Sequence, residues 1–156
     1  MPKTEIYETT VTWIGGHEGH VRMGNGPEMG FSAPPQSHGR AGVLTPEDAF
    51  VGAVNTCVML MFIWAAERFR LDLASYDCRA EGTKLIELDR TEIFTQVVLK
   101  PQIVVRAGNE LPEAVEKRVR RALESAQKYS LVANSVKSKV IIEPEILIDT
   151  RGGGRS

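Results

Sequence analysis

An apolar stretch that runs from Phe50 to Ala66 constrains the fold of this chain more than any other feature. Thr45 precedes it as a predicted N-cap, and Pro46 occupies the first helical position. Glu47 follows in the first turn, where the helix dipole favours a negative charge. The segment therefore predicts a helix that begins sharply at Pro46.

The apolar residues of this helix run round its whole circumference, which is typical of a helix inside a protein. A chain of 156 residues has little room to cover a helix on every side. We infer that a second subunit covers part of it, although a generous single core is an alternative. Asn55 and Thr56 interrupt the run, which falls short of the ~20 residues of a bilayer span. We therefore expect a buried helix and no membrane contact.

The composition is that of a soluble globular protein, with 42% hydrophobic and 25% charged residues and a formal net charge of -1. It lacks the basic excess that nucleic acid or an anionic membrane demands. The N-terminus shows no basic stretch followed by an apolar run, so we expect a cytoplasmic protein whose two cysteines are free thiols. The length predicts a single domain over residues 1–150, followed by a flexible glycine-rich tail at 151–156.

The other segments alternate between strand and helix patterns. β-branched residues at 5–14 and the glycines that follow predict an N-terminal antiparallel meander of two or three strands, and 33–43 reads as a loop. Pro101 predicts an edge or a bulge within its strand. The remaining expected elements are strands at 71–81 and 91–106, an amphipathic helix at 111–129, a helical turn at 131–136 and a last strand at 140–148.

Cys57 lies inside the apolar helix and has two readings: an inert core residue or a protected nucleophile. It lies about three turns into the helix, too deep for the helix dipole to activate it. Glu47 precedes it by ten residues, ~15 Å along an unbroken helix, so it cannot reach the thiol directly. A first-turn carboxylate that stabilises the helix N-terminus also explains Glu47.

Cys78 lies in the strand that follows the helix. The helix climbs ~18 Å from Cys57 to Phe69, and the strand descends ~17 Å from Leu73 to Cys78, so the two thiols are expected at similar height. Strand alternation places Cys78 on one face with Ala74, Tyr76 and Ala80. We therefore expect Cys78 to point inward, and we favour a packed core cysteine.

The three histidines are the candidates for a metal site. His17 and His20 are spaced differently from the helical pair that binds zinc from adjacent turns, and the glycines around them predict a hairpin. His38 lies in the loop that follows. We expect polar turn residues here, and we predict neither a metal nor a cofactor.

Four features together resemble the OsmC/Ohr family of thiol-dependent hydroperoxide reductases. They are the Gly15-Gly16 turn, the Pro46-Glu47 helix opening, a cysteine ten residues after that glutamate, and the segment Lys-Tyr-Ser-Leu-Val-Ala-Asn-Ser-Val at 128–136. The resemblance implies an α+β fold with antiparallel sheets around a long buried central helix. It also implies an intertwined homodimer.

The resemblance further implies that Cys57 is the peroxidatic thiol and that Glu47 partners an activating arginine. Two positions depart from the family pattern: Ser130 replaces the second cysteine, and His17 stands where Ohr-type members carry the arginine. Serine cannot form a disulfide, so resolution would need an external thiol or Cys78. Ser130 is also a natural N-cap for the helical turn that follows. Arg40 and Arg22 are the candidate replacements for the missing arginine.

These observations predict an OsmC-like peroxidase that reduces organic hydroperoxides through Cys57 with an external thiol reductant, in oxidative stress defence. The alternative is a redox-inactive binding protein of the same fold, which uses an apolar pocket at the dimer interface. A third hypothesis makes Cys78 an unusual resolving thiol.

Overall fold

The computed structural model describes residues 1–151. The chain divides into two compact units, Met1–Phe50 and Val51–Ser156, and each is described by itself. The predicted single domain over 1–150 stays a prediction. Apart from Arg151, the expected flexible tail at 151–156 lies outside the described residues.

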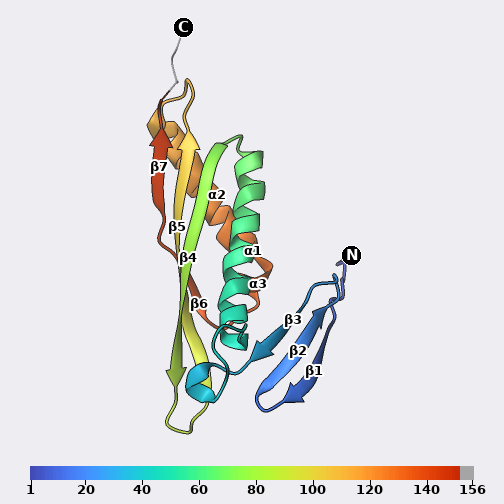
Figure 1. Cartoon of the computed structure of the whole chain (residues 1–156). Helices are drawn as coiled ribbons and strands as arrows, with labels where there is room; N and C mark the ends of the chain where they lie inside the picture. Colours follow the sequence, from blue (N-terminus) through green and yellow to red (C-terminus); the bar gives the residue numbers. More distant parts are fainter. Residues whose placement is uncertain (152–156) are drawn as a thin grey trace. The chain divides into compact units, whose positions relative to one another are not determined.

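The first unit contains an antiparallel meander of three strands: β1 (Thr9–Gly15), β2 (Glu18–Met23) and β3 (Glu28–Ser32) (Figure 1). Gly15 and Gly16 both have positive φ, which suits glycine at the β1–β2 turn. The predicted meander is therefore confirmed, with three strands. The expected loop contains the short 3-10 helix η1 (Pro35–Ser37).

Helix α1 (Pro46–Arg68) begins where the sequence predicted. The backbone N–H of Asp48 donates a hydrogen bond to Thr45 Oγ1 at 3.1 Å, so Thr45 caps the helix. Within this chain α1 is buried along one side, by Val54, Val58, Phe62, Ala65 and Ala66. Leu60 and Trp64 are 48% and 55% exposed. One side of an apolar helix is thus left uncovered by the other elements of its own unit.

Length and composition alone would allow α1 to cross a membrane, since it has 23 residues and a stretch with mean hydropathy 1.9. One such helix is weak evidence, because the core helix of a soluble protein meets the same criteria. The fold places one side of α1 against a sheet, as in such a core helix.

The second unit is built on a sheet whose central strand is β5 (Glu92–Arg106). On one side β5 pairs antiparallel with β4 (Asp72–Ile86). On the other it pairs with β6 (Lys139–Ile142) and β7 (Glu145–Asp149), both parallel to β5. The expected antiparallel pairing is therefore found between β4 and β5, whereas the pairing of β6 and β7 with β5 differs from the expectation. Helix α2 (Pro112–Tyr129) supplies the crossover connection that parallel pairing needs.

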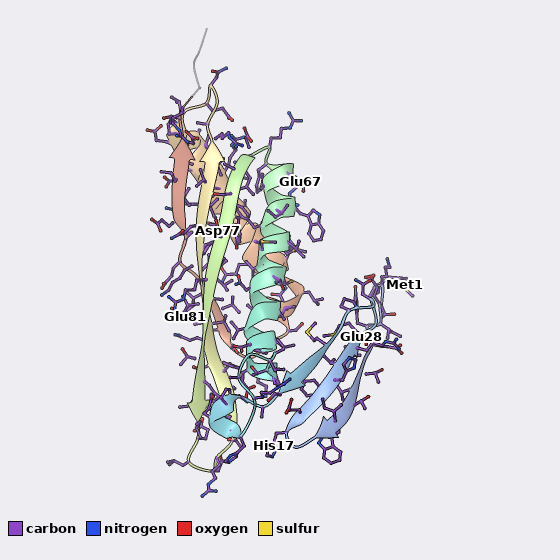
Figure 2. The ribbon with its side chains drawn as sticks, in the orientation of Figure 1. Met1, His17, Glu28, Glu67, Asp77 and Glu81 are labelled. Atoms are coloured by element: carbon purple, nitrogen blue, oxygen red, sulfur yellow. The ribbon has the colours of Figure 1, made fainter. Side chains whose placement is uncertain are left out.

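The core of this unit lies on one face of the sheet. Strand β5 buries every second residue: Val97, Leu99, Pro101, Ile103 and Val105. The buried residues of α2 are those that its periodicity predicted: Val115, Val119, Ala122, Leu123 and Ala126. Helix α1 packs on the same sheet, where the Phe62 and Tyr76 rings lie 5.4 Å apart. Asp77 and Glu81 project from β4 on the side away from α1 (Figure 2).

Pro101 was expected at an edge or a bulge, yet it lies buried in the central strand. Strand β5 changes partner at this point, from β6 up to Leu99 to β7 from Gln102 onward. A residue without an N–H is tolerated where the ladder is interrupted. Pro144 lies in the same interruption, which explains why the single strand expected at 140–148 is two strands.

Candidate functional site

Cys57 is a free thiol of intermediate exposure on α1, so it is neither sealed in the core nor fully open to solvent. Helical spacing places Leu60 and Trp64, three and seven residues later, on its side of the helix. Ala53, four residues earlier, is exposed on the same side. The thiol therefore lies at the margin of the uncovered apolar side of α1, which we call the outer side and define by Ala53, Cys57, Leu60 and Trp64.

Cys78 lies level with Cys57 along the axis of α1, but it is on β4, and Cys57 is on the side of α1 that faces away from β4. Asn55 Nδ2 donates a hydrogen bond to the carbonyl oxygen of Cys78 at 3.1 Å. Asn55 therefore faces β4, and Cys57, about 200° further round the helix, faces away from it. The structure does not bring the two thiols together within one chain. Cys78 as resolving thiol of the same chain has no geometric support.

The surroundings of Cys78 are those of a packed residue. Burial raises the pKa of the Cys78 thiol, while the Tyr76 hydroxyl and the Lys100 backbone N–H offset part of this rise. Burial also raises the pKa of Tyr76. Cys78, Tyr76 and Ala80 are half-buried, as alternation predicted. Ala74 is exposed because a bulge between Leu73 and Ser75 breaks the alternation.

The opposite face of the sheet carries an open depression of about 570 Å³ next to the Cys78–Pro101 pair. Its lining is largely charged and polar: Asp77, Arg79, Lys100, Gln102, Glu143 and Glu145. Cys57 does not line it. The depression is thus chemically different from the apolar outer side of α1.

Ser130 is fully buried between α2 and helix α3 (Leu131–Asn134). Its hydroxyl accepts a hydrogen bond from the Ala133 backbone N–H at 3.3 Å. The predicted N-cap role of Ser130 is confirmed. The position that carries a second cysteine in the resembling family here stabilises a helix start.

The candidate cations of the first unit already have carboxylate neighbours. Arg40 lies 3.2 Å from Glu18, and Arg22 lies 3.5 Å from Glu28. The ring of His17 lies 6.2 Å from that of His38. In the described part of the chain none of these side chains pairs with Glu47.

Glu47 itself has one buried carboxylate oxygen, Oε1, that finds no hydrogen-bond partner among residues 1–151. A buried carboxylate oxygen is costly to leave unpaired. The described side chains contain no group of three or more His, Cys, Asp or Glu suited to a metal, so they do not indicate a metal ion as the partner of this oxygen. Among residues 1–151 this oxygen of Glu47 is therefore left without a hydrogen-bond partner.

In the sequence alone, Asn55 only interrupts the apolar run of α1. The structure shows that it reaches from α1 to β4. The available signal was a hydrogen-bonding side chain in an otherwise apolar helix, because such a group needs a partner when it is buried.

These features define a class of protein: a mixed α+β fold that carries a half-buried thiol on the apolar outer side of a long helix. The sequence profile described as OsmC-like protein matches residues 39–145, and the chain belongs to this family. No curated protein sequence matches the chain.

Solved structures agree with this assignment. An OsmC-like protein of unknown function from Vibrio cholerae is similar with a TM-score of 0.80 at 25% identity, over 90% of this chain and 99% of that one. An organic hydroperoxide resistance protein from Elizabethkingia anophelis gives 0.70 at 16% identity, over 96% and 100%. OhrB of Bacillus subtilis, also an organic hydroperoxide resistance protein, gives 0.60 at 12% identity, over 92% and 98%. These similarities show the α+β fold of the family.

Proposed function

We propose that this protein is a thiol peroxidase that reduces organic hydroperoxides through Cys57, in oxidative stress defence. The observation that carries the proposal is the position of Cys57 beside the uncovered Leu60 and Trp64, rather than in the core. An apolar surface next to a thiol suits a substrate that joins a hydroperoxide group to an apolar body. The organic hydroperoxide resistance proteins of the same fold support this substrate class.

The reaction starts when the Cys57 thiolate attacks the outer oxygen of the hydroperoxide and breaks the O–O bond. The products are a sulfenic acid on Cys57 and an alkoxide, which takes a proton and leaves as the alcohol. The sulfur of Cys57 is oxidised by two electrons, and the hydroperoxide is reduced by the same two electrons.

Regeneration requires a thiol from outside the chain. Ser130 has no sulfur, and Cys78 lies on the β4 side of α1. One external thiol condenses with the sulfenic acid, releases water and forms a mixed disulfide. A second thiol displaces the first, so that Cys57 is reduced and the reductant leaves as its own disulfide.

The proposal includes a second copy of the chain on the outer side of α1. A leucine and a tryptophan that remain about half-exposed on an apolar helix favour an interface. A partner chain could also supply the missing cation for the unpaired Oε1 of Glu47. The functional unit we propose is a homodimer that closes an apolar pocket around Cys57.

The test is cumene hydroperoxide consumption with dithiothreitol as reductant, together with intact-mass analysis. We expect wild type and Cys78→Ser to consume the hydroperoxide and Cys57→Ser to be inactive. Without reductant, only chains that retain Cys57 should gain oxygen at residue 57. Consumption that survives Cys57→Ser would contradict the proposal.

A second candidate is a redox-inactive binding protein that uses the same apolar surface. It is favoured by one observation: Arg22 and Arg40 pair with Glu28 and Glu18, so one chain offers no evident activating cation at Glu47. This candidate predicts that a long-chain alcohol binds in isothermal titration calorimetry while cumene hydroperoxide leaves Cys57 unmodified.

A further inference from the structure

The apolar part of α1 contains few hydrogen-bonding side chains. Between Ala49 and Ala66 they are Asn55 and Thr56, apart from the thiol of Cys57 and the indole of Trp64. The Thr56 hydroxyl donates to the Gly52 carbonyl of its own helix at 2.8 Å. Asn55 instead donates to Cys78 on β4. Asn55 therefore joins this apolar segment to the sheet.

Hydrophobic burial alone does not define which side of α1 packs on the sheet. The buried side contains Val58 and Phe62, and the outer side contains Leu60 and Trp64, which are equally apolar. A rotation that buried Leu60 and Trp64 would take Asn55 away from β4. It would also turn Cys57 toward the core, because Cys57 shares their side of the helix.

The acceptor on β4 also has a reason to need Asn55. The Glu143 N–H donates to the Leu99 carbonyl at 2.8 Å, so the backbone groups of Leu99 and, two residues later, of Pro101 face β6 and β7 and not β4. Cys78 lies opposite Pro101 in the antiparallel register, so the two residues form a pair without mutual hydrogen bonds, and the Cys78 carbonyl points away from β5 at the edge of the sheet. A backbone carbonyl in a partly buried site needs a donor, and the amide of Asn55 supplies one.

We propose that Asn55 is a positioning residue: its hydrogen bond to the Cys78 carbonyl selects the rotation of α1 and keeps Cys57 on the outer side. A single buried polar group that fixes the register of an otherwise apolar helix has precedent in coiled coils. The inference deepens the proposed function, on which its catalytic meaning rests. The rotation itself can be tested without any peroxide.

The test compares Asn55→Leu, which keeps the size but loses the amide, with the matched control Thr56→Val, whose lost hydrogen bond lies within α1. The first readout is Cys57 alkylation by iodoacetamide, followed by peptide mass mapping. Wild type and Thr56→Val should react in one phase. Asn55→Leu should show a second, slower phase, because loss of one hydrogen bond shifts the balance of the two rotations by about tenfold.

The second readout is the indole N–H signals in a nitrogen–proton correlation spectrum. The chain has 2 tryptophans, so wild type should give two such signals, Trp13 and Trp64. Asn55→Leu should split the Trp64 signal, since Trp64 would populate two different environments, the outer side of α1 and the side that packs on the sheet. Asn55→Gln, which keeps a donor, should restore a single Trp64 signal. One alkylation phase together with an unsplit signal in Asn55→Leu would overturn the proposal.

A wild-type measurement keeps the test valid if Asn55→Leu does not fold. The side-chain amide protons of Asn55 should exchange with solvent more slowly than those of the exposed Asn25. Exchange of Asn55 at the rate of an exposed asparagine would refute the positioning role. None of these readouts involves hydroperoxide, so failure of the peroxidase proposal leaves the inference intact, and the reverse also holds.

Discussion

The side-chain amide of Asn55 donates a hydrogen bond to the carbonyl oxygen of Cys78 at 3.1 Å, and this contact fixes how the two thiols of the chain relate. It places α1 level with Cys78, so Cys57 and Cys78 have similar height. It also turns Cys57 away from β4, because residues 55 and 57 lie about 200° apart on the helix. The thiols of Cys57 and Cys78 therefore do not meet within one chain, and we expect them to react independently of each other.

The outer side of α1 should hold the homodimer together. Replacing Leu60 and Trp64 with glutamate places two charges on a surface that we expect to be buried, so the double variant should be monomeric. Sedimentation should give wild type about twice the chain mass of 17.2 kDa and the variant once that mass. Leu111→Glu is the matched control, since Leu111 is 72% exposed just before α2, away from α1 in the sequence, and should leave the dimer intact. A wild type that sediments as a monomer would contradict the dimer.

The raised pKa of Cys78 should make stability fall in alkaline solution. The folded state holds the thiol proton above its ordinary pKa of 9.0, whereas the unfolded state releases it there. The unfolded state then binds fewer protons, so the free energy of unfolding decreases as pH rises above about 9. The raised pKa of Tyr76 acts in the same direction at higher pH.

Urea unfolding with a reductant present, at pH 7, 9 and 10, checks this dependence. Cys78→Ala should lose less stability between pH 7 and 10 than wild type does. Cys57→Ala removes the other thiol and serves as the control. A pH dependence that is the same in Cys78→Ala and in wild type would show that Cys78 is not its source.

The buried N-cap at Ser130 should contribute measurably to stability. Ser130→Ala removes the acceptor for the Ala133 N–H and should cost about 1 kcal/mol of unfolding free energy. Ser125→Ala, which removes an exposed hydroxyl bonded to Arg68, should change stability by less than about 0.5 kcal/mol. Equal effects of the two substitutions would mean that the cap is energetically unimportant.

Local signals in the sequence predicted much of the fold. Thr45 and Pro46 gave the start of α1, and the spacing of Val115 and Val119 gave the buried side of α2, because both depend on contacts between neighbouring residues. The parallel pairing of β6 and β7 with β5 was missed, since strand direction depends on where the chain crosses over. The position of Pro101 was predicted wrongly for a similar reason: a central strand accepts a proline here only because β5 changes its partner strand from β6 to β7 at this point.

The candidate site was predictable only in part. The motif around Cys57 identified this thiol as the candidate reactive residue, and the membership of the chain in the OsmC-like family is confirmed. The side that Cys57 faces could not be read from a helix that is apolar all round, because the hydrophobic pattern has no preferred direction. That information comes from Asn55 and Cys78, which are 23 residues apart and meet only in the folded chain.

The central claim is that Cys57 reacts with organic hydroperoxides, and intact-mass analysis after exposure to cumene hydroperoxide without reductant tests it most directly. The account predicts that wild type and Cys78→Ser gain the mass of one or more oxygen atoms, and that peptide mapping places these atoms on Cys57. Dithiothreitol should reverse the addition of a single oxygen, because a thiol reduces the sulfenic acid. A Cys57 that stays unmodified in folded protein while added free cysteine is oxidised would contradict the account.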